Sequence, residues 1–250
     1  MSTEHPMGIL QRSAGLVGLL AERGPLTPAE IAERLDLPRP SVYRLADALR
    51  DGGLAELLPD ARIQLSLRWL RLADAARAGM SEWSGARPIL DELAAVTRQT
   101  VFLSVPAGDR SVCIDWARGE AINVLVLKPG RSLPMYAGAA GRVTLAFGLE
   151  DRDAYLANAP FEPYTRRTLT TAAKLRKDIA LTRDQGFVVS DEDVTEEIGA
   201  LGVPLLRGTK HPVFAGALSL AGLADELVER RAELVAELRS AATALAATVP

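Results

Sequence analysis

A chain of 250 residues is long enough for two domains with separate cores, and its 48% hydrophobic and 24% charged content is typical of a soluble globular protein. With a net charge of −3, the chain lacks the broad basic surface that a membrane-surface or general polyanion binder needs. It also contains no uninterrupted run of 18 apolar residues that could span a bilayer. The single cysteine, Cys113, excludes an intramolecular disulfide and suits a reducing compartment, so we expect a cytoplasmic protein without membrane contact.

The first helix is expected over the apolar stretch from Ala14 to Ala21. This stretch is not interpreted as a signal peptide, because an acidic residue precedes it and a second helix start follows it at once. Helical spacing predicts an inward face made of Leu10, Ala14, Val17 and Leu20.

The segment between residues 27 and 66 is typical of a winged helix-turn-helix. Thr27, Pro28 and Glu30 form a capping-box pattern that predicts a short helix through Leu35. Two prolines then stop this helix, and a second one begins near Arg39. Its apolar face carries Val42, Leu45, Ala46 and Leu49, and its opposite face carries Arg39, Ser41, Tyr43, Arg44, Asp47 and Arg50.

Two short strands, over 54–58 and 62–67, are expected to form a wing with Arg62 at its tip. A helix with one apolar and one basic face, followed by such a wing, fits the major groove of double-stranded DNA and the adjacent backbone. The predicted DNA contacts are Thr27, Arg39, Ser41, Tyr43, Arg44, Arg50 and Arg62.

Charge leaves an alternative open for this module. Residues 1–70 contain eight Arg and no Lys against nine Asp and Glu, so the module as a whole has no basic excess. It therefore either binds DNA modestly and works in pairs, or contacts protein within a metabolite-binding enzyme or sensor. Pairing is assigned to a linker helix over 67–79, whose stripe of Trp69, Leu72 and Ala76 is a candidate surface for a partner chain.

The remaining segment predicts an α+β domain with an antiparallel sheet. Helices are expected over 86–98, 139–147, 171–185 and 224–248, with an irregular stretch before Arg167. Strands are expected over 101–105, 111–117, 122–127, 187–190, 201–206 and 213–220. Because no regular βαβ repeat is present, the class is α+β. The expected domains are thus a winged module at 7–66, a linker helix at 67–81 and a second domain at 82–250.

Catalytic and metal chemistry have few candidate residues. The only histidines are His5 and His211, which excludes a multi-histidine metal site, and Cys113 lies mid-strand, where a buried thiol is expected. Five acids within 191–197 lack the glycine and spacing of a calcium loop and are interpreted as a solvated turn. We therefore expect no catalytic residue, metal or cofactor. Gly138 to Gly141 precede a helix, and either hold a small anion on free N–H groups or let the helix approach the sheet.

Three stretches together resemble the IclR family of bacterial transcriptional regulators. They are 37–45 (LPRPSVYRL), 136–146 (YAGAAGRVTLA) and 186–193 (GFVVSDED) with its continuation to Pro204, and the resemblance covers roughly 7–249. It implies a homodimer or homotetramer that binds palindromic operators, with a GAF-like C-terminal domain that binds a small effector, an organic acid or aromatic compound.

The resemblance also implies where the effector lies. The helix start at Ala139, Ala140 and Gly141 would face Ser190, Asp191 and Ala200, and the last strand at Ser219 and Ala221. The helix N-terminus favours a carboxylate, so Asp191 is expected to accept from a ligand hydroxyl or from backbone N–H groups. Apolar walls are assigned to Ile122, Leu125 and Leu201.

This sequence departs from the family pattern at several of these positions. Arg142 replaces the usual lysine, Tyr136 a common histidine, and Asp193 and Glu197 a usual glutamate and glycine. Ala221 lacks a hydroxyl that some acid-binding relatives have, which removes one hydrogen-bond donor for a carboxylate. These changes leave two alternatives open: the ligand is less acidic, or the protein is a regulator without an effector.

Overall fold

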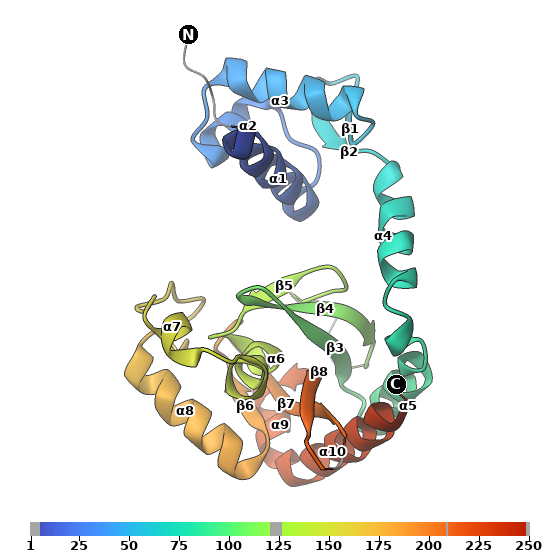
Figure 1. The fold of residues 1–250 in the computed structure, drawn as a ribbon, viewed down its shortest axis with the longest axis vertical. Coiled ribbons are helices and arrows are strands. Elements are labelled where there is room, and N and C mark those ends of the chain that lie inside the picture. Colours follow the sequence, from blue (N-terminus) through green and yellow to red (C-terminus); the bar gives the residue numbers. More distant parts are fainter. Residues whose placement is uncertain (1–5, 121–126, 209, 249–250) are drawn as a thin grey trace. The chain divides into compact units, whose positions relative to one another are not determined.

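The computed structural model describes residues 6–120, 127–208 and 210–248, and divides into two compact units, Met1–Met80 and Ser81–Pro250 (Figure 1). None of the described helices combines the length and hydropathy needed to cross a bilayer. The N-terminal unit contains α1 (Pro6–Arg23), α2 (Pro28–Leu35), α3 (Arg39–Asp51), β1 (Ala55–Leu57), β2 (Ile63–Leu65) and α4 (Arg68–Ala78).

The core of this unit lies where α1, α2, α3 and the hairpin meet. Leu16, Ile31, Val42 and Ile63 are almost fully buried there, one from each element. The expected inward face of α1 is wrong at its start, because Leu10 is 71% exposed and Ala14 is exposed as well. A helix turns about 100° per residue, which places Ala14 about 200° away from the buried Leu16.

The linker helix α4 is hydrogen-bonded to the segment between α3 and β1. Trp69 Nε1 donates to the Leu54 carbonyl (2.7 Å), and an Arg68 guanidinium nitrogen donates to the Gly52 carbonyl (2.6 Å). The indole of Trp69 is therefore half-buried against its own hairpin, whereas Leu72 and Ala76 are exposed.

The C-terminal unit is α+β, as predicted. Its helices are η1 (Ser81–Trp83), α5 (Ala86–Thr97), α6 (Gly138–Val143), the π-helix η2 (Thr144–Gly148), α7 (Arg152–Leu156), α8 (Ala172–Gln185), α9 (Ala224–Glu229) and α10 (Arg231–Thr248). Its strands are β3 (Thr100–Ala107), β4 (Arg110–Ala117), β5 (Ser132–Pro134), β6 (Val188–Asp191), β7 (Ile198–Arg207) and β8 (Val213–Leu223). In the described part of the chain these six form one antiparallel sheet in the order β5-β4-β3-β8-β7-β6.

Four elements differ from the sequence-based expectation. The helix expected over 139–147 is shortened to α6 and continues as a π-helix, and the C-terminal helix is interrupted at Arg230 (φ −97°, ψ 11°). The short elements β5 and α7 were not expected. The strand expected over 122–127 lies almost entirely outside the described residues.

The two faces of the sheet pack against different helices. Leu201 and Val203 on β7, with Leu218 and Leu220 on β8, belong to the main core with α5 and α10. The alternate residues face α6, because successive side chains of a strand point to opposite sides. At Gly202 a Cβ atom would lie 3.1 Å from side-chain atoms of Ala139 and Val143, so α6 lies directly on β7.

Candidate functional site

The outer face of α3 presents the side chains that the sequence assigns to DNA. Arg39, Tyr43 and Arg44 are exposed, with Tyr43 at 55%, and Ser41 is half-buried. An Arg44 guanidinium nitrogen contacts Ser41 Oγ at 3.3 Å. The opposite face buries Val42, Leu45 and Leu49, so the amphipathic helix required for insertion into a groove is present.

Two of the assigned arginines are compensated by acids. Arg50 lies 2.9 Å from Asp47, and Arg62 lies 2.7 Å from Asp60 in the wing turn. The Thr27 hydroxyl is engaged in the capping box, where it accepts from the Glu30 N–H (3.3 Å) and donates to Glu30 Oε2 (2.8 Å). Arg44 contacts a neutral hydroxyl instead of an acid, so its charge is not compensated in the way that the charges of Arg50 and Arg62 are.

A second candidate site is a cavity of about 60 Å³ in the C-terminal unit, between the start of α6 and the sheet. Six of the residues assigned to the effector line it: Ala139, Ala140, Ser190, Ala200, Ser219 and Ala221. The sequence analysis missed the apolar side chains Phe102, Leu127, Leu133, Val194 and Ile198, which also line it. Only strand alternation around Ser219 could have identified one of them, since Phe102 pairs with Ser219 across β3 and β8.

Three assigned effector residues lie elsewhere. Leu201 is 1% exposed in the core against α5 and α10, because it follows Ala200 on β7 and therefore points to the opposite face. Asp191 is exposed and its carboxylate pairs with Arg167. Gly141 lies under β5, where a Cβ atom would be 2.5 Å from the Pro134 carbonyl oxygen. Ile122 and Leu125 lie outside the described residues.

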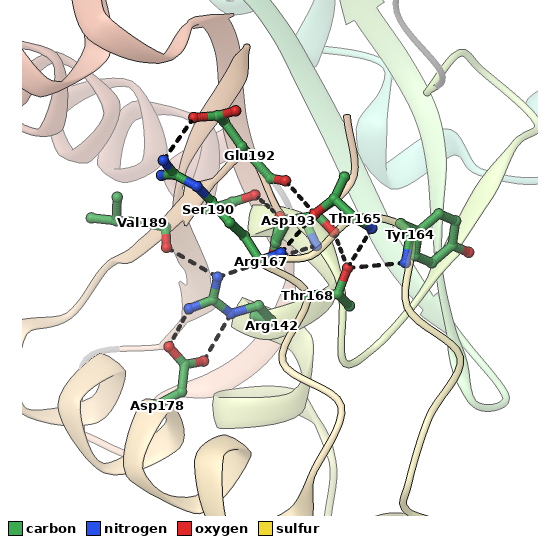
Figure 2. Close-up of polar contacts among 11 residues, drawn as sticks. Arg142, Tyr164, Thr165, Arg167, Thr168, Asp178, Val189, Ser190, Glu192 and Asp193 are labelled. Carbon is green, nitrogen blue, oxygen red and sulfur yellow. Dashed lines mark hydrogen bonds and ion pairs between the residues drawn. The ribbon is translucent and has the colours of Figure 1, made fainter. Parts of the chain in front are cut away.

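Next to the cavity-lining residues Gly138 and Ser190 lies a buried group of three charges that the sequence did not predict (Figure 2). Arg142 Nε donates to Asp178 Oδ2 (2.9 Å), and Arg142 Nη1 donates to Asp193 Oδ2 (3.1 Å) and to the Val189 carbonyl (3.0 Å). The side chains of Arg142, Asp178 and Asp193 are exposed by only 7%, 12% and 2%. Burial alone would lower the pKa of Arg142, but the two carboxylates outweigh burial and raise it.

Asp193 joins this triad to the cavity and to the loop before α8. Its Oδ1 accepts from the Ser190 hydroxyl and its Oδ2 accepts from the Gly138 N–H (3.3 Å), and both donors belong to cavity-lining residues. Its backbone carbonyl accepts from the Thr168 hydroxyl (2.6 Å). The same loop contacts Glu192, whose carbonyl accepts from Thr165 Oγ1 (2.7 Å) (Figure 2).

Two features of the described residues bear on catalysis: the Cys113 thiol and the grouping of side chains that could hold a metal ion. Cys113 is fully buried, and burial together with the charge of Asp115 raises its pKa from 9.0 to about 12. A thiol with this pKa is protonated at neutral pH and is a poor nucleophile. In the part of the chain that the structure describes, no three His, Cys, Asp or Glu side chains are grouped to hold a metal ion.

A winged helix-turn-helix together with a separate α+β unit that encloses a small apolar cavity is the architecture of a transcriptional regulator with its own ligand-binding domain. The model of the IclR helix-turn-helix domain matches residues 9–59, and the model of the bacterial transcriptional regulator IclR C-terminal domain matches residues 81–247. The chain belongs to the IclR family of DNA-binding transcriptional regulators.

Its relatives agree with this assignment. The HTH-type transcriptional regulator Rv1719 of Mycobacterium tuberculosis is 33% identical over 232 residues, which cover 92% of this chain and 88% of that protein. The crystal structure of an IclR transcriptional regulator from Alicyclobacillus acidocaldarius has a TM-score of 0.79 at 23% identity and covers 98% of this chain and 100% of its own. An IclR homologue from Microbacterium hydrocarbonoxydans, complexed with 4-hydroxybenzoate, has a TM-score of 0.77 at 22% identity and covers 96% of this chain and 98% of its own.

Proposed function

We propose that this protein binds a palindromic operator in the cytoplasm as a homodimer or homotetramer, and that a small organic molecule in the α6 cavity changes its affinity for DNA. It does so without catalysis. The cavity is the observation that carries this proposal, because mostly apolar walls with a few hydroxyls are typical of small-molecule sites. The 4-hydroxybenzoate complex of a relative with the same fold supports an organic effector.

The position of the cavity supports a regulatory role. Its walls come from α6, β6, β7 and β8, so a ligand would join elements that are far apart in the sequence. Through Ser190 and Gly138 it would also contact the triad that fixes α8. Regulation requires that the ligand binds the two states of the protein with different affinity, typically by about 1–3 kcal/mol or roughly 5–150-fold.

The test is operator binding by the purified protein, with and without a panel of small aromatic and aliphatic acids, alcohols and amides that includes 4-hydroxybenzoate. Ser219→Leu fills the cavity and Ala140→Asp places a carboxylate in it. Both variants should bind operator DNA and lose the response to any active compound. Ser240→Leu makes the same change as Ser219→Leu on the exposed surface of α10 and should keep the response.

Two outcomes would contradict the proposal. A full response in both cavity variants would place the effector elsewhere. Absence of specific operator binding by the folded wild-type protein would indicate that the winged module contacts protein instead of DNA.

A further inference from the structure

A buried carboxylate of the protein lies next to the cavity and is hydrogen-bonded to two of the residues that line it. Asp193 is 2% exposed, and it accepts hydrogen bonds from the Gly138 N–H (3.3 Å) and from the Ser190 hydroxyl (Figure 2). Both donors belong to residues that line the cavity. A serine hydroxyl has one proton and two acceptor lone pairs. With its proton directed to Asp193, Ser190 Oγ can only accept a hydrogen bond from a ligand.

The buried charges next to the cavity are negative in sum. Arg142 contributes +1 and its partners Asp178 and Asp193 contribute −2, which leaves −1 within the buried triad. Among the described residues that line the cavity there is no lysine, arginine or histidine to compensate a ligand anion. A carboxylate entering here would lose its hydration and meet charge of its own sign.

We propose that the cavity selects an uncharged molecule that donates a hydrogen bond to Ser190, and that Asp193 determines this selectivity against carboxylates. The inference rests on the proposed function, because it concerns the ligand of the same cavity. Asp193 accepts from the N–H of Gly138, the residue immediately before the N–H groups of Ala139, Ala140 and Gly141 that the sequence assigned to a ligand carboxylate. The effector is therefore an amide, an alcohol or a related neutral compound.

The volume of the cavity restricts the size of this compound. An engineered cavity of about 150 Å³ holds benzene. The cavity here measures about 60 Å³, so it accommodates a molecule of a few carbon atoms without movement of its walls. Small primary amides are suitable probes, since an amide and the corresponding carboxylate have nearly the same shape but differ in charge and in the ability to donate.

The experiment compares acetamide with acetate, and propionamide with propionate, by NMR titration of the full-length protein at pH 7. Binding of a compound that is lost in the Ser219→Leu variant is assigned to the cavity. In the wild-type protein each amide should bind at least about tenfold tighter than its carboxylate, since juxtaposed like charges cost several kcal/mol. Asp193→Asn removes the charge and should reduce this ratio by about tenfold or more.

Asp191→Asn is the matched control, because it makes the same substitution two residues away, on an exposed carboxylate outside the cavity. It should leave the ratio unchanged. Carboxylates that bind tighter than amides, and lose binding in Ser219→Leu, would overturn the inference while the proposed function stands. If no compound binds in a Ser219-dependent manner, both are overturned. Should Asp193→Asn fail to fold, the wild-type ratio tests the preference for neutral compounds, and Ser190→Ala, which removes the hydroxyl that Asp193 orients, should reduce that ratio. An unchanged ratio in Ser190→Ala would overturn the inference.

Discussion

Replacing Arg142 with methionine should destabilise the C-terminal unit far more than the same replacement at Arg167. Each arginine contacts two acids: Asp178 and Asp193 in the first case, Asp191 and Glu192 in the second. The difference is burial, because the Arg142 side chain is 7% exposed and the Arg167 side chain is 55% exposed. Comparison of the two variants therefore separates the effect of desolvation from that of pairing.

The expected magnitudes follow from this burial. Removing one partner of a buried ion pair leaves uncompensated charge and costs roughly 3–5 kcal/mol, whereas an exposed pair contributes about 0–1 kcal/mol. In a unit of this size, Arg142→Met should lower Tm by roughly 6–20 °C, at about 2–4 °C per kcal/mol. Arg142→Lys keeps the charge but loses the paired contacts with Asp178. Its loss of stability should therefore lie between the losses in Arg142→Met and Arg167→Met.

Urea unfolding followed by tryptophan fluorescence measures these differences. Two of the three tryptophans, Trp83 and Trp116, belong to the C-terminal unit, and Trp69 belongs to the N-terminal one. The free energy of unfolding should fall for the transition that Trp83 and Trp116 report. It should stay unchanged for the transition that Trp69 reports. Equal free energies of unfolding for Arg142→Met and Arg167→Met would refute the reasoning, because burial would then make no difference.

Three further predictions concern DNA, the thiol and assembly. Arg44→Ala should weaken operator binding by roughly 1–3 kcal/mol in a gel-shift titration and relax the preference at one base position. Arg62→Ala should have a smaller effect, because the Arg62 guanidinium already pairs with an acid. Equal losses of affinity in the two variants would argue against base contact by Arg44. The pKa of Cys113 is raised from 9.0 to about 12, so the free energy of unfolding should fall as pH rises above 9. Cys113→Ala should make that slope shallower in urea titrations, and the part that remains is expected from Tyr155, whose pKa burial raises to about 12. Light scattering at micromolar concentration should find a dimer or tetramer that Leu72→Glu weakens, and a monomeric wild-type protein would contradict this assembly.

Much of the fold could be predicted because its signals are local. The capping box at Thr27 and the glycine after α8, Gly186 with φ 75°, mark helix ends within a few residues of sequence. Strand periodicity likewise located β3, β4 and β8. The α+β class and the IclR family are confirmed by the structure and the family models.

The parts that escaped prediction depend on contacts between distant residues. Arg142 lies 36 residues before Asp178 and 51 before Asp193, and no local pattern indicates that these side chains meet. Leu201 was assigned to the wrong face because a strand with apolar residues on both sides does not reveal which side faces the cavity. The change from α6 to a π-helix at Thr144 has no recognised sequence signal either.

The alternation along β7 and β8 has a consequence for how such a regulator changes in evolution. Ala200, Ser219 and Ala221 touch the cavity, whereas their neighbours Leu201, Leu218 and Leu220 belong to the core. A substitution at one of the first three can alter ligand preference without removing a core side chain. New specificity can thus be acquired one residue at a time at little cost in stability, so a single scaffold can diversify toward many metabolites.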